Sequence, residues 1–326
     1  MISLPSRHRL ALCLLALVLL GLIQPTQANP PNNLSGTCYL FAYFLSPGTD
    51  GLHLIWSSDG LKWKLLNSGK SVFEPTIGHH VLRDPCLLLG PDGIFRLVWT
   101  EGGSPHSIGY ASSRDLITWT NETEIHVMSA VPSARNCWAP YVTYDAANDR
   151  YLIIWASTIP GKFSDTANSS ENNYNHRLFI TTTKDFVHFA PTRLFYNPGF
   201  NTIDATILYA LGKYYLIFKN ETLFPYAQKN LWMATSNSMA GPYGNLTGAI
   251  KTNPPAWVEG PTAIKINNYY ILYYDCYMNQ HFGAIRSTDL YNWKDITSLL
   301  SMPKGIRHGS VLTVPSDIVA NLINRK

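Results

Sequence analysis

The sequence predicts an all-β fold, a five-bladed β-propeller, and three observations predict it. Strand-like segments such as FRLVWT, YLIIWA and YYLIFK dominate the chain, and no convincing amphipathic helix exceeds a few turns. A polar turn ending on an aromatic residue recurs at spacings of about 50 to 70 residues, which is typical of propeller blades. The chain also begins with strands that lack an inner strand, and ends on an inner strand that lacks a returning partner.

Each repeat is expected to form one blade. The turns are SSDGLKW, SSRDLITW, TTKDFVHF and STDLYNW, with ATSNSMAGPY as a looser copy, and their final aromatic residues are Trp63, Trp119, Phe189, Trp293 and Tyr243. The expected inner strands cover 83–89, 137–144, 203–209, 258–265 and 307–314. The first four lead through turns into a returning strand, a third strand and an outer strand that carries the aromatic residue.

The two ends of the chain complete one another. Residues 39–44, 51–56 and 61–66 supply three strands without an inner strand, and residues 307–314 supply an inner strand alone. Pairing of the C-terminal strand with the N-terminal strands would close the ring and leave no free sheet edge. A β-sandwich is the alternative, but it does not explain five aligned strand openings.

The N-terminus has the pattern of a secretory signal peptide over residues 1–28, which leaves 29–326 as a single five-bladed propeller domain. Arg7 and Arg9 precede an apolar run from Leu10 to Ile23, and small residues follow it. The run is short for a membrane span, although an uncleaved anchor is the alternative. Because both arginines leave with the peptide, the formal net charge falls by two, from +4 to +2. A secreted protein that contacts neither nucleic acid nor membrane is expected.

Cysteines and sequons agree with secretion. Cys13 leaves with the signal peptide, and the remaining cysteines can form two disulfides with three connectivities: Cys38, Cys86, Cys137 and Cys276. No Cys or Cys/His spacing suggests zinc. Five N-x-S/T sequons fit a glycoprotein: Asn33, Asn121, Asn168, Asn220 and Asn245.

Polar and aromatic residues stand at the openings of the five inner strands. They are Asp84, Trp138, Asp204, Glu259 and His308. Since inner strands converge on a central channel, these side chains are expected to meet at one mouth of it. Gathering carboxylates is costly without a function or a cation. The structural alternative is that they cap strand ends or hold an ion.

The ends of the returning strands reach the same face of the propeller. Their acidic and aromatic residues are rivals for a catalytic role: Glu101, Glu221, Asp275 and Tyr277. We expect them to be solvated or to contact substrate at the rim.

The chain resembles glycoside hydrolase family 43, whose members are secreted five-bladed propeller enzymes. The resemblance covers essentially the whole mature chain and rests on LRDPCLL, NCWAPYV, NTIDATIL, WVEGPTAI and IRHGSVL, in that order. The sequence departs from commoner members because about 55 mature residues precede Asp84, where those members place this aspartate near the N-terminus. This indicates a less typical subgroup and weakens transfer of the substrate.

The resemblance implies roles for the three carboxylates. Asp84 would be the general base, Asp204 would tune the acid's pKa and orient substrate, and Glu259 would be the general acid. Hydrolysis with inversion needs an acid and a base whose carboxyl groups lie roughly 6.5–9.5 Å apart. A neighbouring negative charge keeps the acid protonated, which suits the role given to Asp204.

Other pocket residues have less specific roles. Trp138 offers a flat apolar face for a sugar ring, or simply packs in the channel. His308 can bind calcium or water, donate a hydrogen bond to substrate, or be structural. Asn136 and Arg307 flank these positions as weaker substrate contacts, and Glu221 joins them from the rim.

The implied function is inverting hydrolysis of plant-type polysaccharide or oligosaccharide. α-L-Arabinofuranosides are the first expected substrates, β-D-xylosides the second and β-galactosides a distant third. No cofactor beyond a structural calcium is expected, and a monomer is the default. One alternative is a glycan-binding propeller, either a lectin or an inactive relative. Another is a retaining β-fructosidase-like enzyme, although the chain lacks an Asn-Asp-Pro-Asn-Gly stretch and has Glu-Gly-Pro where Glu-Cys is expected.

Overall fold

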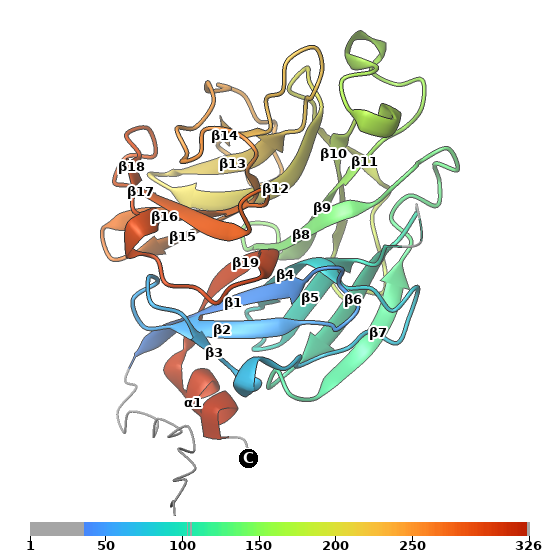
Figure 1. Cartoon of the computed structure of the whole chain (residues 1–326). Helices are drawn as coiled ribbons and strands as arrows, with labels where there is room; N and C mark the ends of the chain where they lie inside the picture. The colour runs from blue at the N-terminus through green and yellow to red at the C-terminus, as the bar shows by residue number, and fades with distance from the viewer. Residues whose placement is uncertain (1–35, 103, 105, 325–326) are drawn as a thin grey trace, which may run out of the picture. The chain divides into compact units, whose positions relative to one another are not determined.

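The structure is a computed structural model that describes residues 36–102, 104 and 106–324. The predicted signal peptide, Cys13 and the sequon at Asn33 lie outside these residues. In the described part, five antiparallel sheets follow one another along the chain, which confirms the five-bladed propeller (Figure 1).

Each sheet forms one blade, numbered I to V below and given from the inner strand outward. Blade I contains β19 (Ile306–Pro315), β1 (Thr37–Leu45), β2 (His53–Ser57) and β3 (Lys64–Leu65). Blade II contains β4 (Arg83–Leu89), β5 (Phe95–Thr100), β6 (Ile108–Ser113) and β7 (Trp119–Ile125). Blade III contains β8 (Trp138–Asp145), β9 (Arg150–Ser157), β10 (Arg177–Thr183) and β11 (Arg193–Tyr196).

Blades IV and V complete the ring. Blade IV contains β12 (Thr202–Ala210), β13 (Lys213–Asn220) and β14 (Asn230–Ser236), and blade V contains β15 (Glu259–Ile266), β16 (Tyr269–Cys276), β17 (His281–Ser287) and β18 (Lys294–Asp295). Short 3₁₀ turns cover Asn67–Gly69, Ser164–Thr166, Glu171–Asn173 and Thr297–Leu299. Second strands such as β5 and β9 are largely apolar and buried along nearly their whole length, because both of their faces pack against other strands.

The ring closes as the sequence predicts. In Figure 1 the red strand β19 lies beside the blue strand β1, and the two pair antiparallel from Thr37↔Pro315 to Leu45↔Ile306. The innermost strand of blade I therefore comes from the C-terminus, and its other strands come from the N-terminal part of the domain. This pairing covers the inner edge that β1 would otherwise expose.

The polar turns recur as the same hydrogen-bonded structure in four blades. A hydroxyl group ends the third strand and accepts the backbone N–H groups two and three residues ahead, while an aspartate caps the next two N–H groups. The hydroxyl–aspartate pairs are Ser57–Asp59, Ser113–Asp115, Thr183–Asp185 and Ser287–Asp289. The sequence repeat is therefore a turn between the third and fourth strands.

Two features differ from the sequence prediction. The looser repeat in blade IV forms no fourth strand, and only an isolated bridge joins Thr235 and Gly244 there. The chain also continues past its last strand as helix α1 (Ser316–Asn324), which buries Val319 and Leu322 in the core cluster that contains Leu40. None of the helices in the described residues is long and apolar enough to cross a membrane.

The cysteine prediction is corrected by the structure. Cys38, Cys86, Cys137 and Cys276 are all buried, and no disulfide joins any two of them. They lie in four different blades or blade openings, so the propeller holds them apart. Burial raises the pKa of the Cys86 and Cys276 thiols to about 12. Among the sequons, Asn220 is buried at the end of β13, which does not suit a glycan.

Gly309 provides a stability test of ring closure. A Cβ atom at this position would lie 1.9 Å from the Ala42 carbonyl oxygen of the paired strand β1. Gly309→Ala should therefore lower the free energy of unfolding by about 1–3 kcal/mol, as overpacking does. Urea denaturation measures this change, and Gly248→Ala is the control because its Cβ meets nothing within 4 Å. Equal stability of the two variants would contradict the close pairing.

Candidate active site

A pocket of about 270 Å³ opens where the inner strands begin. It brings together most of the residues singled out from the sequence, and its lining is Arg83, Asp84, Thr100, Gly102, Trp138, Ile203, Asp204, Lys219, Glu221, Glu259 and His308. The inner strands of all five blades contribute to this lining, and β19 of blade I contributes His308. Both carboxylates and cations line this small cavity.

The pocket is built by one bulge that repeats in all five inner strands. In each strand two residues oppose a single residue of the returning strand, as at Asp84 and Pro85 between the pairs Arg83↔Thr100 and Cys86↔Val98. The equivalent register shifts lie between Trp138 and Tyr141, between Ile203 and Thr206, between Glu259 and Thr262, and between Arg307 and Ser310. Bulges turn side chains away from the sheet, which suits an active site.

This register corrects the alignment expected from the sequence. Asp84, Asp204 and His308 are the first bulge residues, and Ala139 and Gly260 hold that position in the other two strands. Trp138 and Glu259 lie one residue earlier, level with Arg83, Ile203 and Arg307. The pocket therefore has two layers, rather than one ring of five equivalent residues.

The bulge residues have unusual backbone conformations. Asp84 and Asp204 adopt φ values of 50° and 57°, and Gly260 adopts 55°. Such left-handed residues cost energy when they carry a side chain, and strain of this kind is concentrated at functional sites. A Cβ atom on Gly260 would also lie 2.5 Å from His308 Cδ2, which explains the glycine that follows Glu259.

Asp84 is paired with a cation in the lower layer. Its Oδ2 accepts a hydrogen bond from Thr100 Oγ1 at 2.8 Å, and its Oδ1 lies 3.3 Å from His308 Nδ1. Burial alone would raise the pKa of Asp84, but the hydrogen bond and charge of His308, with Arg83 and Thr100, hold that pKa below its usual value. Asp84 is thus an ionised carboxylate over the neutral pH range.

Asp204 has the opposite protonation tendency. Its side chain is only 5% exposed, and Oδ2 accepts a hydrogen bond from Gly260 N at 3.0 Å. Burial is the main cause that raises the pKa of Asp204 to about 6; His308 and Lys219 oppose the rise, and the charges of Glu259 and Asp84 support it. One pocket thus holds two aspartates whose environments separate their pKa values, a pattern of acid–base sites.

Glu259 lies between two cations in the upper layer. Its Oε2 is 3.1 Å from Lys219 Nζ, and its Oε1 accepts a hydrogen bond from Arg307 Nη2 at 3.0 Å. The same arginine binds Asp275 Oδ2 through Nε at 2.7 Å. Lys219 was not anticipated from the sequence, where it is one lysine at the end of an apolar strand.

Comparison with known proteins now identifies the family. The model of the family-43-related glycosyl hydrolases, described as a probable glycosyl hydrolase domain, matches residues 35–318. The chain belongs to this glycosyl hydrolase family. The match spans nearly the whole chain, including every strand of the propeller.

Known relatives of this hydrolase domain are distant. An α-L-arabinofuranosidase of Bifidobacterium longum is 23% identical over 247 residues, which are 64% of this chain but only 23% of that protein. A thermostable family-43 glycoside hydrolase superposes with a TM-score of 0.56 at 16% identity, covering 75% of this chain and 82% of that one. An α-L-arabinofuranosidase from Lactobacillus brevis gives 0.52 at 16% identity, covering 66% and 72%. The solved structures support the fold.

An aromatic stack supports one wall of the hydrolase pocket. The Trp138 ring lies 4.7 Å from that of Tyr174 and 5.4 Å from that of His176, and Tyr174 and His176 stack nearly in parallel. Burial lowers the pKa of His176 to about 4, so this wall is neutral. Trp138 lines the pocket with its ring held in place, as a platform for the apolar face of a sugar requires.

The remaining sequence-predicted residues lie in different places. Asn136 is absent from the pocket lining, since its side chain is bound to the backbone at Ala156 and Thr158. Among the rim residues, Glu221 lines the pocket, Asp275 is fully buried behind Arg307, and the Tyr277 ring lies 4.8 Å from Lys219 Nζ. Glu101 is buried beside Ser107, outside the lining.

The calcium expected at His308 stays a prediction, and the charge of this histidine bears on it. Burial would lower the pKa of His308, but Asp204, Asp84 and Glu259 together raise it to about 9, so the imidazole is protonated at neutral pH. A protonated imidazole has no lone pair for a cation. No group of three or more His, Cys, Asp or Glu side chains within the described part of the chain is arranged to hold a metal ion.

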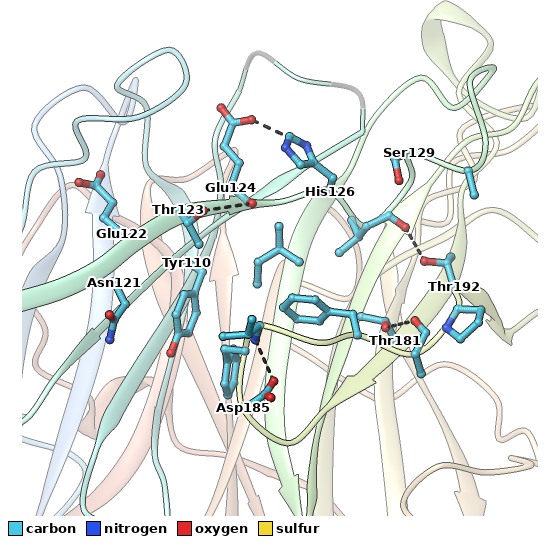
Figure 2. Close-up of a pocket in the computed structure, with 18 residues that line it drawn as sticks. Tyr110, Asn121, Glu122, Thr123, Glu124, His126, Ser129, Thr181, Asp185 and Thr192 are labelled. Carbon is cyan, nitrogen blue, oxygen red and sulfur yellow. Dashed lines mark hydrogen bonds and ion pairs between the residues drawn. The ribbon is translucent and has the colours of Figure 1, made fainter.

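A second cavity, of about 810 Å³, lies between β7 and the turn before β11 (Figure 2). Its carboxylates already have structural partners: Glu122 accepts hydrogen bonds from Thr76 N and Oγ1 at 2.6 Å, and Asp185 caps its own turn. Tyr110 and Phe186 also line this cavity and stack on each other. None of Asp84, Asp204 and Glu259 lines this cavity, so the smaller pocket is the candidate active site.

The His308–Asp84 pair gives a pH prediction. For the base role expected of Asp84 its carboxyl group must be ionised, so kcat/KM should fall as pH drops through the pKa of Asp84. Removing the neighbouring cation in His308→Gln should raise that pKa and move the acid limb of the profile upward by about one pH unit. The control is His188→Gln, because His188 forms a similar pair with Asp185 outside the pocket. An acid limb unchanged in both variants would contradict the pairing.

Proposed function

We propose that this protein is a secreted inverting glycoside hydrolase that acts on plant-type polysaccharide or oligosaccharide. α-L-Arabinofuranosides are its first expected substrates and β-D-xylosides its second. The single observation that carries the proposal is the gathering of Asp84, Asp204 and Glu259 in one pocket, each with different partners. Family membership and the arabinofuranosidases among the distant relatives support the choice of sugar.

The proposed mechanism uses one displacement. Asp84, kept ionised by His308, takes a proton from water as that water attacks the anomeric carbon. Glu259 donates a proton to the glycosidic oxygen as the bond breaks, so the leaving group departs neutral. Asp204 lines the same pocket as Glu259, which supports the role of tuning the acid and orienting the substrate that the family resemblance gives it.

A glycan-binding propeller is the second candidate. A binding site needs aromatic and polar groups, which Trp138 and the pocket rim also provide. It has no need of separated pKa values in buried aspartates, which an acid–base enzyme requires. The two functions therefore differ in whether bound sugar is cleaved.

A substrate panel tests the proposal. The purified protein is incubated with p-nitrophenyl α-L-arabinofuranoside, β-D-xyloside and β-D-galactoside, since one structural neighbour is an exo-β-1,3-galactanase. Release from one sugar is the expected result. If none of the aryl glycosides is cleaved, soluble arabinan and xylan are tested next. Binding of these polymers without cleavage would overturn the hydrolase proposal in favour of the glycan-binding candidate.

A further inference from the structure

Charged side chains of alternating sign form a continuous row, and its three central members, Glu221, Lys219 and Glu259, line the pocket. Lys219 Nζ lies 2.7 Å from Glu221 Oε2 and 3.1 Å from Glu259 Oε2, and Arg307 joins Glu259 to Asp275 at 3.0 and 2.7 Å. Lys229 ion-pairs with the other oxygen of Glu221. In order, the row is Lys229, Glu221, Lys219, Glu259, Arg307 and Asp275. Three cations alternate with three carboxylates, and Glu259 is held on both of its oxygens.

Lys219 occupies a fixed position in this row. It projects from β13 opposite Ile203, next to the bulge that carries Asp204, and is only 3% exposed. Its ammonium group contacts Glu221, Glu259 and the face of Tyr277. A buried ammonium is costly unless paired, so Lys219 must keep these contacts, and Glu259 Oε2 has a defined place.

The other two carboxylates of the row, Asp275 and Glu221, are anchored independently of Glu259. Asp275 is fully buried and also accepts a hydrogen bond from His308 N at 3.1 Å. Glu221 is held by Lys229 and by its backbone N–H, which donates to the Asn201 carbonyl at 2.8 Å. Lys219 therefore lies between a fixed carboxylate and the carboxylate proposed as the acid.

We propose that Lys219 is a positioning residue for the acid: it fixes Glu259 Oε2 at the pocket wall, and Glu221 moderates the positive charge that Lys219 presents to it. The inference rests on the proposed function in assigning the acid role to Glu259. Two substitutions should then act on Glu259 in opposite directions. Removing the cation of Lys219 favours protonated Glu259, and removing the anion of Glu221 favours ionised Glu259.

The other charges that face Glu259 stay constant in this comparison. Asp204, Asp84 and protonated His308 lie in the lower layer of the pocket. Arg307 and Asp275 follow Glu259 in the row, on the side away from Lys219, and Tyr277 lies against Lys219. All are present in each variant. A difference between the variants therefore reports on the Lys219–Glu221 pair.

The test uses Lys219→Met and Glu221→Gln in the full chain, with Lys229→Met as the matched control. Lys229 contacts Glu221 but is not among the ion-pair partners of Glu259 within the described residues. Carbon-13 NMR of protein labelled at glutamate carboxyl carbons follows the titration of Glu259, whose signal is assigned by its loss in Glu259→Gln. The pH profile of kcat/KM on the active aryl glycoside gives a second readout, because its basic limb falls as the acid loses its proton.

Lys219→Met should move the Glu259 titration and the basic limb to higher pH, by about one unit or more. Glu221→Gln should move both to lower pH by a smaller amount, and Lys229→Met should move them less than Lys219→Met. Shifts in the same direction for the two test variants, or none, would overturn the proposal even if activity falls. The NMR titration of Glu259 does not require enzymatic activity. An inactive wild-type protein would therefore contradict the proposed hydrolase function, and the effect of Lys219 on Glu259 could still be tested.

Discussion

Asp84→Asn should lower kcat/KM by about 10²–10⁴-fold on every glycoside that the wild type cleaves. The amide keeps the size of the side chain, and its oxygen can still accept the hydrogen bond from Thr100. It cannot accept a proton from the attacking water. Since water attack and bond cleavage occur in one step of an inverting reaction, the loss should not depend on the leaving group.

Steady-state kinetics with a good and a poor leaving group checks this result. The control is Asp115→Asn, the same change in an outer turn of blade II, where Asp115 caps Ile117 N and Thr118 N. This variant should keep wild-type kcat/KM. An Asp84→Asn enzyme that is folded and as active as wild type would remove Asp84 from the chemistry.

Glu259→Gln should show a loss that depends on the leaving group. For an oligosaccharide, whose departing oxygen needs a proton, we expect kcat/KM to fall by about 10²–10⁴-fold. For a 2,4-dinitrophenyl glycoside, whose leaving group departs as a stable anion, the fall should be much smaller. The substitution also removes the one carboxylate that pairs with both Lys219 and Arg307, so the melting temperature should drop as well.

The contrast between Asp84→Asn and Glu259→Gln separates base from acid. Glu122→Gln is a suitable control, because Glu122 binds Thr76 in the blade II region away from the active-site pocket. Equal losses on both substrates in Glu259→Gln would indicate a binding or structural role. A different carboxylate would then have to supply the proton.

Much of the propeller could be predicted because its repeated turn depends on hydrogen bonds between residues that are close in sequence. The hydroxyl–aspartate turns use short side chains that bond to their own backbone, so they are visible wherever they occur. The inner strand 83–89 matches β4, and 307–314 falls within β19. Blade IV has no outer strand, and its copy of the turn, SNSMAGPY, lacks the aspartate that the other four copies share.

The sequence predicted several of the residues that line the pocket, but not the register of the strands that carry them. Aligning residues by chemical type placed Trp138 and Glu259 level with Asp84, whereas alignment on Pro85, Pro140 and Pro261 gives the observed bulges. Proline lacks an N–H group and therefore suits the unpaired second residue of a bulge. That signal was present in the sequence.

Lys219 could not be found in the same way. Its role depends on which residue of the returning strand pairs with the position before the bulge, here Ile203. A one-residue error in register puts another residue there. The absent disulfides have a similar cause, since cysteine spacing says nothing about which blades bring two sulfur atoms together.

The stereochemistry of the first product tests the central claim most directly. Proton NMR during the first minutes of hydrolysis of p-nitrophenyl α-L-arabinofuranoside, or of the β-D-xyloside if that is the sugar cleaved, distinguishes the two anomers before they equilibrate. A single displacement with Asp84 as base and Glu259 as acid predicts the inverted product first, β-arabinose or α-xylose. Initial release of the retained anomer would contradict the account, because it requires a carboxylate to attack the sugar instead of activating water.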